Sequence, residues 1–264
     1  MKRFVNGVNI AYGLAGDGLP VVFIHGFPLS REMWSRQVEH VESLCSTVAL
    51  DLRGHGESDK PDTPFTIDMM ADDVLSLLSD LRVGQAVFVG HSMGGYVALR
   101  AYSRQPGAFK GMVLVNTRAE ADSPEARKGR LETASRVRAG GGGAFRKDFA
   151  EKLLSDKSRV HKPELYSELG KMMEESPDSM MARSLEAMAG RPDSLSLLPR
   201  ISVPTLIVAG AEDKVMPMIS AQALKSGIPG SRLAVIGEAG HMVNMEEPEA
   251  FNSELREFLD SIAQ

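Results

Sequence analysis

The feature that most constrains the fold of this chain is an alternation of short apolar runs with amphipathic helical patterns. Each apolar run has the length of one strand and is bounded by Gly, Pro or polar residues, which is typical of buried parallel strands. A short hairpin with Asn6-Gly7 at its turn is expected before them, over residues 3–12. The predicted strands are Val21–His25, Ser46–Asp51, Ala86–Gly90, Gly111–Asn116, Thr205–Ala209 and Arg232–Ile236.

Helical patterns separate and follow these runs. Thr66 can cap one helix that begins at Ile67, a second spans Ser92–Gln105, and a third runs from about Pro248 to Ile262. A strand followed by a helix, repeated along the chain, predicts an α/β fold. Its sheet is expected to be mostly parallel and covered by helices on both faces.

The alternation is interrupted between about Arg118 and Pro199, where no run resembles a strand. We therefore expect residues 1–118 and 199–264 to form one sheet-bearing core, with residues 119–198 inserted into it as a helical cap. Within the insertion, the run Gly140–Gly143 is either a joint between two helices or a loose surface loop.

Composition excludes several classes of protein. The chain has 264 residues, 43% of them hydrophobic and 25% charged, which is ordinary for a soluble globular protein. The net charge of −5 gives no reason to expect nucleic acid or an anionic membrane as partner. Cys45 is the only cysteine, and no apolar run is long enough for a signal peptide or a membrane span. We expect a cytoplasmic monomer or small homo-oligomer.

The sequence Gly90-His91-Ser92-Met93-Gly94 fits the pattern Gly-x-Ser-x-Gly. A nucleophilic serine on a sharp turn from strand to helix needs neighbours with almost no side chain, so that the strained turn can close. An apolar strand precedes this motif and a helical pattern follows it. The context favours Ser92 as a nucleophile over an ordinary glycine-rich turn.

A serine nucleophile needs a base, and the base needs an acid. Among the six histidines, His241 lies on a glycine-bearing loop after the last predicted strand. Asp213 follows the preceding strand, which gives the order nucleophile, acid, base. Glu212 is a neighbouring alternative to Asp213, and Asp51 is a weaker one.

Acyl transfer also requires two backbone N–H groups that face the developing oxyanion. Met93, which follows the nucleophile at a helix N-terminus, is expected to supply one of them. Phe27, in the loop after an early strand, is expected to supply the other.

With these motifs in order, the chain resembles enzymes of the α/β-hydrolase fold along nearly its whole length. Its nearest resemblance is to small carboxylesterases and 3-oxoadipate enol-lactonase-like hydrolases. The resemblance implies Ser92 as nucleophile, His241 as base, Asp213 as acid, and Phe27 and Met93 as the oxyanion hole. The segments that carry it are His25-Gly26-Phe27-Pro28, Asp51 to Ser58, Gly90 to Gly95, Gly210 to Asp213, and Gly240-His241.

The expected reaction is hydrolysis of a small carboxylic ester or lactone through an acyl-enzyme, with no metal and no organic cofactor. Two alternatives use the same site: hydrolysis of a C–C bond in ring-cleavage products, and cofactor-free haloperoxidase or perhydrolase chemistry. A ligand receptor that retains the triad is a third alternative. Ser92 stands where haloalkane dehalogenases and epoxide hydrolases carry Asp, so those two branches are set aside.

The chain contains 15 methionines but only one tryptophan. Methionine fills irregular gaps in a core, and it also lines adaptable binding surfaces. The second property suggests a soft, uncharged acyl pocket between cap and sheet. The residues expected to line it are Trp34, Met172, Met180, Met181, Met188, Met216 and Met242.

Overall fold

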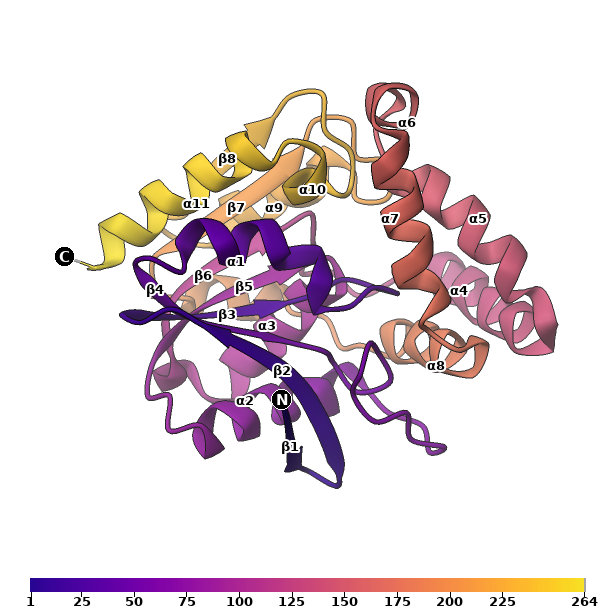
Figure 1. Cartoon of the computed structure of the whole chain (residues 1–264), viewed down its shortest axis with the longest axis horizontal. Helices are drawn as coiled ribbons and strands as arrows, with labels where there is room; N and C mark the ends of the chain where they lie inside the picture. The colour runs from indigo at the N-terminus through magenta and orange to yellow at the C-terminus, as the bar shows by residue number, and fades with distance from the viewer. Residues whose placement is uncertain (264) are drawn as a thin grey trace.

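A computed structural model describes residues 1–263 and contains an eight-stranded sheet in the order β1-β2-β4-β3-β5-β6-β7-β8 (Figure 1). The pairs β1–β2 and β2–β4 are antiparallel, and every other neighbouring pair is parallel. The strands are β1 Lys2–Val5, β2 Val8–Ala15, β3 Leu19–Ile24, β4 Cys45–Leu50, β5 Ala86–His91, β6 Phe109–Val115, β7 Thr205–Gly210 and β8 Arg232–Ile236.

All six predicted runs form strands, and the predicted hairpin joins β1 to β2. Asn6 and Gly7 have φ angles of 47° and 79°, the left-handed values that a tight two-residue hairpin turn requires. The prediction of a mostly parallel α/β sheet is therefore confirmed.

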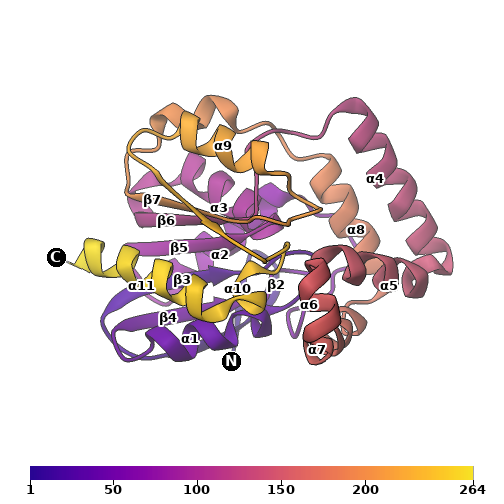
Figure 2. The same ribbon diagram turned by 90° about the horizontal axis from the view of Figure 1, so that it is seen from above.

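Side chains alternate along the strands between two hydrophobic cores. On β3, Val22 and Ile24 belong to one core, while Val21 and Phe23 belong to the other. The first core packs under α2 (Ile67–Asp80), α3 (Met93–Arg104) and α9 (Met218–Gly227). The second packs under α1 (Ser35–Val41) and α11 (Pro248–Ala263), on the opposite face of the sheet (Figures 1 and 2).

Between β6 and β7 the chain forms five α-helices that lie together at one end of the sheet in both views (Figures 1 and 2). These helices are α4 Pro124–Arg136, α5 Gly142–Leu153, α6 Asp156–His161, α7 Pro163–Glu174 and α8 Asp178–Ala189. The glycine run connects α4 to α5 through the helical turn Val137–Gly141, where Gly140 has a φ of 97°. Of the two interpretations of this run, the joint between helices is the correct one.

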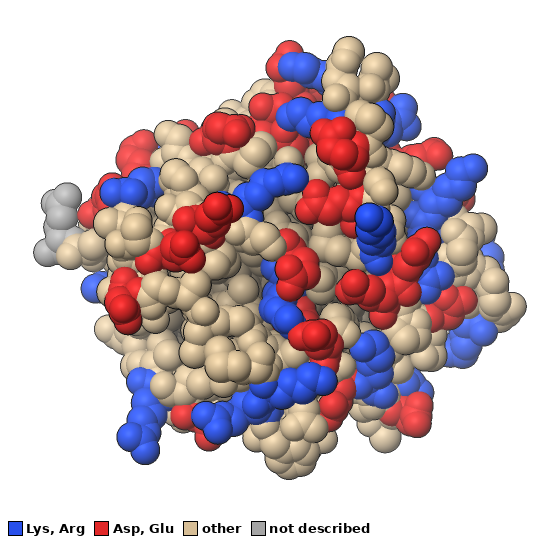
Figure 3. Space-filling model, viewed as in Figure 1, with Lys and Arg blue, Asp and Glu red and all other residues tan. Residues whose placement is uncertain are grey.

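The remaining helical elements are short. They are η1 Arg31–Trp34, η2 Pro106–Ala108, η4 Leu195–Arg200 and α10 Val243–Glu246. Acidic and basic side chains are interspersed on the face shown in Figure 3, without a broad area of either sign. Within residues 1–263, no helix combines the length and the apolar character needed to cross a bilayer.

Candidate active site

Ser92 lies on a sharp turn between β5 and α3, where its φ and ψ are 52° and −111°. A left-handed φ is unfavourable for a residue with a side chain, so the surrounding structure must hold it in place. The flanking glycines allow this turn to close. A Cβ on Gly90 would lie 2.5 Å from the Gly94 carbonyl oxygen, and one on Gly94 would lie 2.2 Å from the Ile24 carbonyl oxygen. Ser92 is 9% exposed and lines a cavity.

His241 and Asp213 form a buried hydrogen-bonded pair in the loops after β8 and β7. His241 Nδ1 lies 2.7 Å from Asp213 Oδ2, and the other carboxylate oxygen accepts the N–H groups of Val215 and Met216 at 2.7 and 2.8 Å. Burial alone would raise the pKa of Asp213, but the charge of His241 and these hydrogen bonds lower it. The Asp213 carboxylate therefore accepts a hydrogen bond from Nδ1 of His241, which makes Nε2 the proton-accepting atom of the imidazole.

Neither of the two alternatives to Asp213, Glu212 and Asp51, is positioned to pair with His241. Glu212 is exposed to solvent. Asp51 is buried and accepts hydrogen bonds from the backbone N–H groups of Arg31 and Glu57 at 2.7 and 2.9 Å, and it pairs with the Arg31 guanidinium. Of the three carboxylates, only Asp213 contacts His241.

Three buried polar side chains hold the His241 loop. Asn116 Nδ2 and His91 Nε2 each donate to the His241 carbonyl oxygen at 2.7 Å. The Glu246 carboxylate accepts the N–H groups of Gly240 and Met242 at 2.9 and 3.1 Å. Its second oxygen accepts the Ser155 N–H at 2.8 Å, which connects the histidine loop to the inserted helices. Glu246 was not predictable from the sequence, because a glutamate just before the helix expected from Pro248 resembles an ordinary surface residue.

Two backbone N–H groups near Ser92 are without a protein acceptor. Among residues 1–263, neither Phe27 N–H nor Met93 N–H donates to another backbone or side-chain group. Met93 is also the first residue of α3, where the helix dipole favours negative charge. Both groups are thus available to an oxygen atom of a bound molecule.

The loop that carries Phe27 is held by histidines. His25 Nε2 accepts the Leu52 N–H at 2.9 Å, so its proton resides on Nδ1, which lies 2.9 Å from the Gly26 carbonyl oxygen. A Cβ on Gly26 would lie 2.3 Å from Nδ1 of His91. Only glycine fits between this loop and the His91 ring.

The buried histidines predict a loss of stability in mild acid. Burial lowers the pKa of His25 to about 4 and the pKa values of His55 and His91 to about 3. In the unfolded chain a histidine has a pKa near 6.5. Between pH 6.5 and 4 the unfolded chain therefore binds a proton at each of these histidines, whereas the folded chain does not. Stability is therefore full above pH 6.5, and it falls as pH drops toward 4 by about 1.4 kcal/mol per pH unit for each histidine.

Urea unfolding at pH 7, 6 and 5 measures this slope. In the variant His55→Gln, the free energy of unfolding should fall with decreasing pH less steeply than in wild type, because one fewer proton binds on unfolding. The variant His161→Gln, at an exposed histidine, is the matched control. A free energy of unfolding that does not change between pH 7 and 5 would contradict the prediction.

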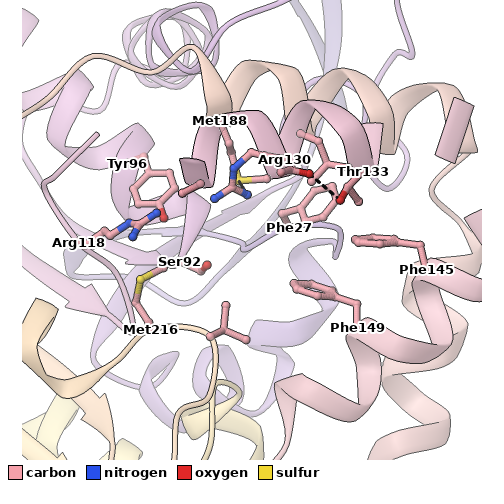
Figure 4. Close-up of a pocket in the computed structure, with 14 residues that line it drawn as sticks. Phe27, Ser92, Tyr96, Arg118, Arg130, Thr133, Phe145, Phe149, Met188 and Met216 are labelled. Carbon is pink, nitrogen blue, oxygen red and sulfur yellow. Dashed lines mark hydrogen bonds between the residues drawn. The ribbon is translucent and has the colours of Figure 1, made fainter. Parts of the chain in front are cut away.

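The cavity beside Ser92 has a volume of about 270 Å³ and lies between the core and α4, α5 and α8 (Figure 4). Phe27, Phe145 and Phe149 form its aromatic end, with ring centroids 5.3 to 6.0 Å apart. Arg118 and Tyr96 lie at the opposite end of the view. Val215 and Met216, which follow Asp213, contribute to the wall.

The expected methionine pocket is correct only in part. Met188 and Met216 line the cavity. Trp34 does not, because its ring packs in the core under α1 and α11, 5.3 Å from Phe23 and 6.0 Å from Phe251. The other four methionines are also buried core residues: Met172 and Met242 in the same core as Trp34, Met180 and Met181 in the other. The expectation of an uncharged pocket is wrong as well, because Arg118 and Arg130 line it.

Within residues 1–263, no three His, Cys, Asp or Glu side chains come together as the ligands of a metal ion would. Ser92 and Phe27 line the cavity, and Met93 directly follows Ser92. The imidazole–carboxylate pair lies next to its wall, because Val215 and Met216 line the cavity and donate to Asp213. This set is suited to attack on a carbonyl carbon with proton transfer by the imidazole.

The chain matches the family described as alpha/beta hydrolase fold over residues 20–248. It is 32% identical over 245 residues to 3-oxoadipate enol-lactonase 2 of Acinetobacter baylyi, over 93% of this chain and 90% of that protein. It is 31% identical over 285 residues to a non-heme chloroperoxidase of Kitasatospora aureofaciens, over 97% of each. A solved structure of a thermophilic esterase from Thermogutta terrifontis with malate bound has a TM-score of 0.95 and 36% identity, over 100% of this chain and 97% of that one.

Proposed function

This chain belongs to the α/β-hydrolase fold family and is a carboxylic ester hydrolase, and we propose that it cleaves small esters or lactones through a covalent acyl-enzyme on Ser92. One observation carries the proposal. Ser92 faces a cavity from a strained turn, and a buried His241–Asp213 pair lies in the neighbouring loops. The relatives named as an enol-lactonase and an esterase support the substrate class.

In the proposed reaction, Ser92 Oγ attacks the carbonyl carbon while Nε2 of His241 accepts its proton. Asp213 stabilises the imidazolium that forms, through the 2.7 Å hydrogen bond to Nδ1. The N–H groups of Phe27 and Met93 hold the oxyanion, and each such donor lowers the barrier by about 3–4 kcal/mol. The imidazolium then protonates the departing alkoxide, and a water molecule deprotonated by His241 releases the acid.

We further propose that residues 119–198 act as a cap over the site. Helices α4, α5 and α8 supply much of the cavity wall. Ser155, in the inserted segment, donates to Glu246, whose carboxylate also holds the His241 loop. A cavity of about 270 Å³ limits the substrate to a small ester, so long acyl chains are expected to be poor substrates.

The test is a series of p-nitrophenyl esters from acetate to decanoate, beside one lactone. We expect an optimum at short chains and a steep fall beyond them. In parallel, the protein is inactivated with diethyl p-nitrophenyl phosphate and digested for mass spectrometry. A single diethylphosphoryl group on the peptide that contains Ser92 is the expected result. Labelling at another residue, or no ester or lactone turnover, would refute the proposal.

A second candidate function uses the same residues. The relative named as a non-heme chloroperoxidase favours perhydrolysis, in which hydrogen peroxide replaces water in attacking the acyl-enzyme. Incubation with acetate and hydrogen peroxide, followed by an assay for peracetic acid, distinguishes this candidate. Peracid formation at a rate below one hundredth of ester hydrolysis would assign the protein to hydrolysis.

A further inference from the structure

The backbone of His241 is held from two sides. On one side, His91 and Asn116, at the ends of strands β5 and β6, donate to the His241 carbonyl oxygen at 2.7 Å. On the other side, the His241 N–H donates to the carbonyl oxygen of Leu153 at 2.9 Å. Leu153 is the last residue of α5, so it belongs to the inserted segment. A buried N–H without an acceptor costs free energy, so buried His241 relies on the inserted segment for this hydrogen bond.

Glu246 makes a second connection between the same two parts of the chain. One oxygen of its carboxylate accepts the N–H groups of Gly240 and Met242, which flank His241, at 2.9 and 3.1 Å. The other oxygen accepts the N–H of Ser155 at 2.8 Å. A carboxylate accepts hydrogen bonds on both of its oxygens, which an amide side chain cannot do. Glu246 therefore connects both neighbours of His241 to the inserted segment.

The inserted chain passes directly against the histidine loop. A Cβ on Gly240 would lie 2.6 Å from the Ser155 nitrogen and 2.8 Å from the carbonyl carbon of Leu154. Such distances are too short for any side chain, so glycine at this position is what lets the two backbones approach each other. The hydrogen bonds of Leu153 and Glu246 thus span a tightly packed contact.

Two ion pairs at the surface join the same regions. Lys214, which directly follows Asp213, lies 2.6 Å from Asp156, the first residue of α6. Lys157, also on α6, pairs with Glu238 in the loop after β8. Exposed ion pairs add little stability. They show, however, that the inserted segment is placed against the loops of both the acid and the base of the proposed reaction.

Helix α5 also reaches the cavity. Phe145 and Phe149 on this helix form the aromatic end of the cavity together with Phe27 (Figure 4). Phe149 lies about one helical turn before Leu153, whose carbonyl oxygen accepts the His241 N–H. A substrate that contacts these rings therefore contacts the helix whose end holds the base.

We propose that Leu153, Ser155 and Glu246 position His241 for proton transfer, so that the inserted helices are needed for catalysis and do more than cover the cavity. This inference rests on the proposed ester hydrolysis, because it assigns positioning residues for its base. None of the three residues is among those that line the cavity. They act through the orientation of the imidazole, so disconnecting them should lower kcat and leave KM nearly unchanged.

The first variant is Glu246→Gln, which keeps the size of the side chain. In either orientation its amide nitrogen faces an N–H group, so glutamine loses the connection on one side or the other. We expect kcat for p-nitrophenyl acetate to fall by about 10- to 100-fold, as a small misplacement of a reacting group does, with KM within about twofold of wild type. Glu249→Gln is the matched control at an exposed glutamate of α11, and both constants should be unchanged.

The second variant acts from the inserted segment. Ser155→Pro removes the N–H that Glu246 accepts. Proline suits the backbone here, because Ser155 has a φ of −60° and Leu154 is extended, with φ and ψ of −104° and 148°. Ser155→Ala is the reference, since it loses the same hydroxyl group and keeps the N–H. We expect kcat to be about tenfold lower in Ser155→Pro than in Ser155→Ala, the effect of one hydrogen bond.

Hydrogen exchange followed by mass spectrometry reports the connection without catalysis. Glu246→Gln should speed exchange in the peptide that contains residues 153–157, and Ser155→Pro should speed it in the peptide that contains residues 240–246, each by about tenfold. A peptide from β5 should be unchanged in both variants. Faster exchange confined to the peptide that carries the substitution would reject the connection.

Wild-type kcat in folded Glu246→Gln, or a loss of activity that appears wholly in KM, would reject the inference. The two Ser155 variants decide it in the same way if Glu246→Gln does not fold. A wild-type protein without ester or lactone turnover would reject the proposed function alone. The rate at which diethyl p-nitrophenyl phosphate labels Ser92 then tests the positioning of the base, since it needs no ester turnover. Equal rates in wild type and Glu246→Gln would reject the inference.

Discussion

Replacing Ser92 with alanine should lower kcat for p-nitrophenyl butyrate by about 10⁴- to 10⁶-fold, since losing the nucleophile of a triad removes covalent catalysis entirely. The oxyanion donors at Phe27 and Met93 are backbone groups and are retained, so a small residual rate above the uncatalysed reaction is expected. The variant should fold normally, because Ser92 forms its structural hydrogen bonds through its backbone. Its N–H donates to Val115, and its carbonyl oxygen accepts from Thr117 at 2.7 Å.

The measurement is steady-state turnover together with thermal unfolding of the purified variant. Ser103→Ala is the matched control, because Ser103 lies on the same helix α3 with an exposed side chain. We expect wild-type turnover in that control. Undiminished turnover in purified Ser92→Ala would exclude Ser92 as the nucleophile, whatever the behaviour of other variants.

Replacing Asp213 with asparagine should lower kcat by about 10⁴-fold at pH 7. Asparagine has the same shape, and its carbonyl oxygen can still accept the N–H groups of Val215 and Met216. Its amide nitrogen would then face Nδ1 of His241 and donate to it. That hydrogen bond places the histidine proton on Nε2, where it blocks proton acceptance from Ser92.

The matched control for this prediction is Glu212→Gln, which changes the neighbouring exposed carboxylate and should leave kcat unchanged. Thermal unfolding verifies that Asp213→Asn is folded. Two-dimensional NMR of the imidazole nitrogens reports the tautomer directly, and we expect the proton of His241 to move from Nδ1 to Nε2. A variant with the shifted tautomer and full activity would contradict the assigned role of Asp213.

The strands, the sharp turn at Ser92 and the loops that carry His25 and His241 were predictable from the sequence. Each of them depends on residues that are close together in the chain. Strand length, alternation and the bounding glycines specify a buried strand locally. A side chain at either glycine beside Ser92 would clash with backbone atoms a few residues away or at the end of the adjacent strand. The turn therefore requires glycine at fixed spacings from the serine, and this pattern can be read in the sequence. The order of Ser92, Asp213 and His241 is likewise a property of the sequence.

The cavity residues were much less predictable. Trp34 and Met188 are both large and apolar, and only packing separates the core residue from the lining residue. Methionine satisfies a buried core and a binding surface equally well, so composition does not distinguish them. Glu246 is similar, since its buried position depends on three N–H groups, one of which belongs to the inserted segment.

The sequence by itself determined the family, the order of the strands along the chain and the residues of the proposed triad, because these follow from local pattern and spacing. The tertiary structure alone decided the charge of the cavity. Arg118, Arg130 and Arg191 come from separate segments and converge on one buried carboxylate, Asp122. An ion-pair cluster depends on distances in space, and no spacing in the sequence encodes which arginines will share a partner and which will keep a donor free.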